Sequence, residues 1–204
     1  MTTSAIEAMR VALDSFEVEG IGHNIPFLSA VMDHEKFVSG NMTTAFIAEE
    51  YPDGFAGVEL DAAALRQIAA SCAAMNRVSE IRRTRVSGRL DNHERRVDDQ
   101  ATVTLQGQTY HLTIAPYTGG ADVGFEDGST LRVEGDWTPG KTLADMTVDG
   151  KPLVLKADKI THGFRIRSRG ADMKVHVRSR RQAELAALMP EKLAPDTSKL
   201  LLCP

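Results

Sequence analysis

The residues best suited to chemistry in this chain are seven arginines within a stretch of twenty positions. A guanidinium group forms paired hydrogen bonds with carboxylates and suits polar contacts at protein interfaces. The stretch therefore predicts a surface that contacts a partner, whereas a plainer interpretation is the solvated end of a helix. The seven residues are Arg77, Arg82, Arg83, Arg85, Arg89, Arg95 and Arg96.

A short polar loop interrupts the arginine stretch. Ser87 and Gly88 break the helical pattern before them, because glycine has no steric barrier to a sharp turn. The residues that follow offer polar groups and no apolar stripe to bury. A loop with so little to contribute to a core is free to contact a partner. The candidate partner-binding residues are Ser87, Gly88, Arg89, Leu90, Asp91, Asn92 and His93.

Other groups with chemical potential have plainer explanations. A basic row on one predicted hairpin suits phosphate, but a solvated strand face has the same pattern. That row is Arg165, Arg167, Arg169, Lys174, His176 and Arg178. The histidines lack metal-site spacing, and Cys72 fits a small core residue. We therefore expect no catalytic, metal-binding or cofactor-binding residues in this segment.

Composition limits the classes of protein. The chain has 204 residues, 42% of them hydrophobic and 25% charged, which suffices for one full domain and a smaller one. A net charge of -4 and an aromatic content of 5% disfavour nucleic-acid binding. A small barrel with a basic stripe that binds nucleic acid is the alternative function.

The sequence has neither a signal-peptide pattern nor a membrane-length apolar run, so we expect no membrane partner and a cytoplasmic or mitochondrial-matrix setting.

The first 57 residues predict short helices rather than a finished domain. Ser4 and Glu7 have the spacing of a capping box before an amphipathic helix, and Asn24 is a predicted N-cap for a second helix. A third short helix is expected around Phe46. Such helices cannot bury their apolar faces against one another alone, so we expect this segment to need a missing partner.

A long helix is predicted from an N-cap at Asp61 to about Arg85. Leu65, Ile68 and Met75 form an apolar stripe, and alanines keep the remaining surface small. Helices without a strongly polar face are normally buried on several sides. This helix is therefore expected inside a core.

The region after Asp98 predicts hairpins. Turn pairs recur about every twenty residues between runs of alternating apolar and polar positions. We expect an α+β fold with an antiparallel up-and-down barrel of about eight strands around the long helix. A two-sheet sandwich with the helix outside is the main rival, and a last short helix should span Gln182 to Met189. The turn pairs are Gln106-Gly107, Asp127-Gly128, Asp149-Gly150 and Arg169-Gly170.

At this point the sequence resembles a known family. The strings ALDSF, GIGHNIPFL and FIAEEYP, at residues 12–16, 20–28 and 46–52, resemble the end of the biotin carboxylase domain in propionyl-CoA carboxylase α subunits. The string VSGRLDNH at residues 86–93, and the hairpins after it, resemble the family's BT domain. In that family the BT domain is a barrel around a central helix that joins the carboxylase domain to the carboxyltransferase β subunit.

The resemblance implies a division and a role for the chain. Residues 1–57 would be the C-terminal remnant of a biotin carboxylase domain, 58–190 a BT-like domain, and 191–204 a linker towards a biotinyl domain. The chain would be a non-catalytic assembly module of an ATP- and biotin-dependent acyl-CoA carboxylase. Propionyl-CoA is the substrate that the resemblance favours for the parent enzyme, and methylcrotonyl-CoA and longer acyl-CoA substrates are the alternatives. Residues 87–93 would be the hook that contacts the rest of the complex.

The same resemblance implies which groups belong elsewhere. Biotin, ATP and Mg would serve the parent enzyme, because the Ala-Met-Lys-Met string that carries biotin does not occur here. The expected partners are the carboxyltransferase β subunit and the biotin carboxylase and biotinyl domains of the same subunit.

Overall fold

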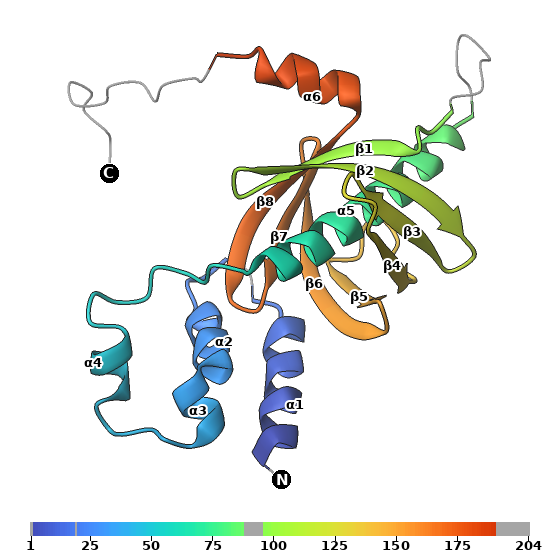
Figure 1. Ribbon diagram of the computed structural model, residues 1–204. Coiled ribbons are helices and arrows are strands. Elements are labelled where there is room, and N and C mark those ends of the chain that lie inside the picture. Colours follow the sequence, from blue (N-terminus) through green and yellow to red (C-terminus); the bar gives the residue numbers. More distant parts are fainter. Residues whose placement is uncertain (1, 19, 88–95, 191–204) are drawn as a thin grey trace.

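The computed structural model describes residues 2–18, 20–87 and 96–190, which form a helical segment followed by a barrel (Figure 1). Four helices come first: α1 Thr2–Ser15, α2 Ile25–Asp33, α3 Glu35–Ser39 and α4 Phe46–Glu50. The long helix α5, Ala62–Thr84, precedes eight strands and the final helix α6, Arg180–Ala187. The strands are β1 Gln100–Leu105, β2 Gln108–Tyr117, β3 Gly120–Phe125, β4 Thr130–Gly135, β5 Leu143–Val148, β6 Lys151–Ile160, β7 Gly163–Ser168 and β8 Ala171–Arg178.

The eight strands close into one antiparallel barrel in sequence order. Each strand pairs with the next, and β1 pairs with β8, with Val103 opposite Val177. The predicted up-and-down barrel is confirmed, and the sandwich is not formed. Three of the four predicted turns place both central residues at positive φ, as at Asp149 and Gly150, which matches the twist of two-residue hairpins.

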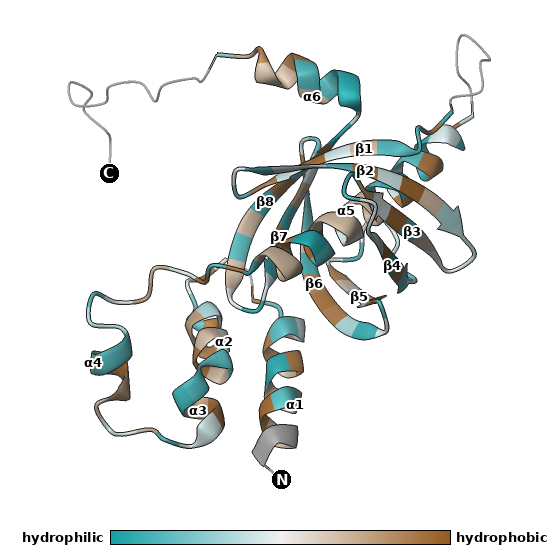
Figure 2. Ribbon diagram, viewed as in Figure 1, coloured by the Kyte–Doolittle hydropathy of each residue, from teal (hydrophilic) through white to brown (hydrophobic). Residues whose placement is uncertain are grey.

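Helix α5 runs through the barrel (Figure 1), as the small residues of its sequence predicted. Its N-cap is Asp61, whose Oδ1 accepts a 2.7 Å hydrogen bond from the Ala64 amide. Buried residues follow one another without a break from Ile68 to Met75, so every side of this part of the helix faces the barrel wall. Apolar and polar bands alternate along the strands (Figure 2), and the apolar ones form a single core with α5.

The ends of the short helices differ from the predictions. Helix α1 already begins at Thr2, so Ser4 lies within the helix and is not its N-cap. Asn24 occupies the N-cap position of α2, but its side chain forms no capping hydrogen bond. Helix α3 was not predicted, and His34 caps it by accepting from the Lys36 amide. Helix α6 begins at Arg180, earlier than expected, because Ser179 and Gln182 form a complete capping box.

The β7–β8 hairpin attaches the barrel to the helical segment, at a contact that we call the seam. Asp14 of α1 is buried and accepts from the Arg169 amide at 2.8 Å, while the Arg169 Nε lies 3.3 Å from the other carboxylate oxygen. Lys156 of β6 donates to the Leu13 carbonyl at 3.2 Å. Gly170 lies so close to α2 that a Cβ there would be 2.5 Å from the Pro26 carbonyl oxygen. The first helices therefore have a partner inside this chain.

The same helices leave part of their apolar surface uncovered. Large hydrophobic side chains exposed to solvent before residue 58 include Met9, Val11, Phe16, Ile21 and Ile47, of which Phe16 and Ile21 are 62% and 72% exposed. The expectation of a further partner for this segment remains a prediction. Within the described ranges, no helix combines the length and the apolar character that crossing a bilayer requires.

We expect Ile68→Asp to lower the free energy of unfolding by about 3 kcal/mol or more, because Ile68 is 2% exposed inside the barrel and the new carboxylate would have no partner. Val78→Asp is the matched control, since Val78 lies on the same helix but is 40% exposed, and it should cost less than about 1 kcal/mol. Thermal or urea unfolding measures both. Similar losses in the two variants would contradict a threaded helix.

The seam generates a second prediction. Arg169→Ala removes the guanidinium that faces Asp14, and we expect amides of α1 and α2 to exchange about tenfold faster with deuterium while the barrel amides stay unchanged. Arg132→Ala is the control, because Arg132 forms a comparable pair with Asp122 on the barrel surface. Mass spectrometry measures the exchange. If the α1 amides exchange equally slowly in both variants, Arg169 does not hold the seam.

Candidate functional site

The predicted partner-binding loop begins where α5 leaves the barrel. Ser87 is exposed after the end of α5, and Gly88, Arg89, Leu90, Asp91, Asn92 and His93 lie outside the described residues. What the structure shows is the surface at the base of this loop. Two hollows flank the last turns of α5 there, and we call the surface that they form the barrel mouth.

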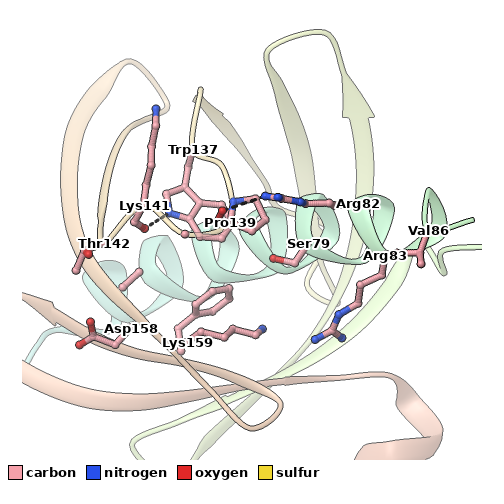
Figure 3. Close-up of a pocket in the computed structure, with 13 residues that line it drawn as sticks. Ser79, Arg82, Arg83, Val86, Trp137, Pro139, Lys141, Thr142, Asp158 and Lys159 are labelled. Carbon is pink, nitrogen blue, oxygen red and sulfur yellow. Dashed lines mark hydrogen bonds between the residues drawn. The ribbon is translucent and has the colours of Figure 1, made fainter.

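The first hollow is a pocket of about 460 Å³ between α5, the β4–β5 connection and strands β6 and β7 (Figure 3). Trp137 is buried at its floor, and the indole N–H donates a 2.9 Å hydrogen bond to the Lys141 carbonyl. The Trp137 ring meets Phe164 edge to face, with centroids 5.7 Å apart. The floor is therefore apolar and fixed in position by packing.

Positive charges surround this apolar floor. Arg82 donates to the Pro139 carbonyl at 3.1 Å and so closes one side of the pocket (Figure 3). The Lys159 ammonium lies 4.4 Å from the centroid of the Phe164 ring, at the distance of a cation–π contact. Partial burial lowers the pKa of Lys159 below the usual value for lysine, and the charge of Arg83 lowers it further.

The second hollow, of about 880 Å³, lies on the other side of α5 against β8 and the chain that leads into β1. Arg77 crosses its base, where the Nη1 donates to the Asp98 carbonyl at 2.9 Å and lies 2.7 Å from Asp99 Oδ1. Arg77 and Arg82 thus bind inside the chain, so the predicted arginine surface is partly structural. Arg85 and Arg96 are exposed, and Arg89 and Arg95 lie outside the described residues.

The charge of the barrel mouth is opposite to that of the chain. Among the described residues that line the two hollows, only Glu80, Asp98 and Asp158 carry carboxylates. The whole chain has a net charge of -4. The lining is therefore more positive than the chain as a whole, even though Arg77 pairs with Asp99 and Lys141 pairs with Asp136 beside it. The seven cations are Arg77, Arg82, Arg83, Arg96, Lys141, Lys159 and Arg178.

The sequence reasoning missed the floor of the pocket. Trp137 is the chain's one tryptophan and precedes the turn residues Thr138, Pro139 and Gly140, which was the available signal. A large ring next to a turn is placed to cover the end of a barrel. Lys159 carried no signal, because its position over Phe164 depends on the β6–β7 register.

The remaining candidates fit their plainer interpretations. In the basic row of the β7–β8 hairpin, Arg165 pairs with Asp172 and Arg167 pairs with Asp158, so both guanidinium groups have carboxylate partners. Cys72 is fully buried, and burial raises the pKa of its thiol, which keeps the thiol protonated and unreactive. The described part of the chain contains no cluster of side chains suited to a metal ion.

Comparisons with known proteins match both parts of the chain. The model of the propionyl-coenzyme A carboxylase BT domain matches residues 68–192, and that of the biotin carboxylase C-terminal domain matches residues 1–49. A biotin carboxylase from Halalkalibacterium halodurans is 46% identical over 43 residues, which cover 21% of this chain and 10% of that protein.

Two relatives match nearly the whole chain. A propionyl-CoA carboxylase alpha chain from Ruegeria pomeroyi is 71% identical over 98% of this chain and 30% of its own length. A mitochondrial propionyl-CoA carboxylase alpha chain from Mus musculus is 32% identical over 98% of this chain and 28% of its own length. The chain thus spans less than a third of these relatives. The resemblance found in the sequence is confirmed, and the chain belongs to the family of propionyl-CoA carboxylase alpha chains, whose BT domain forms its barrel.

Proposed function

We propose that this chain is a non-catalytic assembly module of an ATP- and biotin-dependent acyl-CoA carboxylase. In this role the barrel joins a biotin carboxylase part to a carboxyltransferase β subunit. Residues 1–57 would be the end of the carboxylase domain, 58–190 the BT-like domain, and 191–204 the link to a biotinyl domain. Biotin, ATP and Mg would act in other domains of the parent enzyme, with propionyl-CoA as its substrate.

The observation that carries this proposal is the seam. Residues 1–49 match a carboxylase domain and residues 68–192 match a BT domain, and the β7–β8 hairpin holds the two parts together. The exposed apolar residues of α1 and the loops after it offer a surface for the rest of the carboxylase domain. The barrel mouth lies at the other end of α5, where it would face a second partner (Figure 1).

The similarity also bears on location. The relatives include a bacterial chain and several that are named mitochondrial. We infer a cytoplasmic setting for a bacterial chain of this kind and the mitochondrial matrix for a eukaryotic one.

The test is a triple alanine variant of the candidate loop, Arg89→Ala, Leu90→Ala and His93→Ala, in the full-length α subunit. We expect its affinity for the carboxyltransferase β subunit to fall at least about tenfold in interferometry, because the variant removes contacts and not core packing. The melting temperature should change little, since surface substitutions usually stay within about 0.5 kcal/mol each.

A matched control replaces three exposed charged residues of α6, Arg180, Arg181 and Glu184, by alanine. It should leave both association and melting temperature unchanged. Unchanged association of the loop variant would remove the hook assignment. A large loss of thermal stability in that variant would place the loop in the core.

A further inference from the structure

The barrel mouth combines two features that are normally separate on a protein surface. An apolar pocket of about 460 Å³ has room for one large side chain, and its floor is made by Trp137 and Phe164. Lysine and arginine side chains stand around it and around the adjoining hollow. A ligand that fits both features must present an apolar group next to negative charge.

Lys159 is the cation that best defines the ligand. It lines both hollows, and its ammonium is near the Phe164 ring and 3.5 Å from the Asn76 amide oxygen. Among the described residues no carboxylate forms a salt bridge with Lys159. Lys159 is exposed, so the carboxylate of a partner can reach its ammonium, and the docked partner surface would then keep bulk water away from the pair.

The aromatic rings argue against nucleic acid as the ligand. Bases stack on exposed ring faces, but Trp137 is 7% exposed and Phe164 is fully buried. The two rings therefore present too little surface to act as a platform for a base. The pocket also adjoins Val86, which is 64% exposed immediately before the candidate loop. A ligand in the pocket would therefore be continuous with whatever the loop contacts.

We propose that the barrel mouth binds an acidic segment of a partner protein, with an apolar side chain of that segment in the Trp137–Phe164 pocket and a carboxylate on Lys159. This rests on the proposed assembly function, because the segment belongs to the subunit that the loop contacts. The pocket supplies apolar burial and position, and the surrounding cations orient the acidic segment during encounter.

The test uses the full-length α subunit and the carboxyltransferase β subunit, with affinity measured by interferometry at 50 mM and 500 mM salt. Lys159→Glu should weaken association about tenfold or more at low salt and much less at high salt, because salt screens the charge that was reversed. Lys151→Glu is the matched control. It reverses an exposed lysine on the same strand, roughly 26 Å away at the opposite end of the barrel, and should have no effect.

A second variant tests the pocket without changing charge. Thr142→Trp places a ring in the space that the partner side chain would occupy, so association should weaken at both salt concentrations. Association that is unchanged in both Lys159→Glu and Thr142→Trp would overturn the proposal. If the loop variant still lost association, the assembly function would stand and only the pocket assignment would fall.

A titration with nucleic acid tests the alternative that the barrel mouth binds phosphate groups. We expect a single-stranded 20-nucleotide DNA probe to show no saturable binding to the wild-type chain at 50 mM salt. Tight binding that weakens steeply with salt and is lost in Lys159→Glu would show that the positive surface serves phosphate and not an acidic protein segment.

Discussion

The structure depends on one steric constraint, which is the passage of a helix through a barrel of only eight strands. A barrel of this size has an interior that ordinary side chains fill by themselves. Helix α5 fits because alanines and Cys72 supply much of its buried surface, so the strands approach the helix backbone closely. Large residues remain at a few positions, such as Leu65, Ile68 and Met75, where the wall leaves room for them. Larger side chains on α5 would bury more apolar surface, but they would also make the helix too wide for the barrel.

That constraint also determines where contacts can be made. A helix of 23 residues is about 35 Å long, so its ends emerge at opposite mouths of the barrel. The N-terminal end leads back to the helices held by Arg169, and the C-terminal end leads to the loop beside the Trp137 pocket. Because the middle of α5, from Ile68 to Met75, is buried on every side, the helix holds these two surfaces at a fixed separation. A fixed separation of this kind suits the proposed assembly function, in which the domain would connect two larger bodies.

The barrel could be predicted because its signals are local. Alternating residues, four turn pairs and a helix with small side chains each indicated the same architecture, and Asp61 marked the helix start correctly. The helix ends among the first 57 residues were less predictable, because several residues there can serve as caps. Ser4 and Asn24 had suitable side chains, yet the first lies inside a helix and the second forms no capping bond. Tertiary packing decided between them.

The candidate site was harder to predict because it depends on strand register. Lys159 and Phe164 come together only when Ile160 pairs with Gly163 across the β6–β7 turn. The arginine stretch did not reveal the roles of its members, since Arg77 and Arg82 bind carbonyl groups of this chain. Lys159, in contrast, places its ammonium over the Phe164 ring at the apolar floor. Arg77 and Arg82 attach the end of α5 to neighbouring loops through their bonds to carbonyl groups. They bring positive charge to the barrel mouth whether or not they contact a partner. Under the proposal above, an acidic surface approaches the end where the loop departs, whereas the β7–β8 turn at the other end of the barrel holds the helical segment through Arg169 and Asp14.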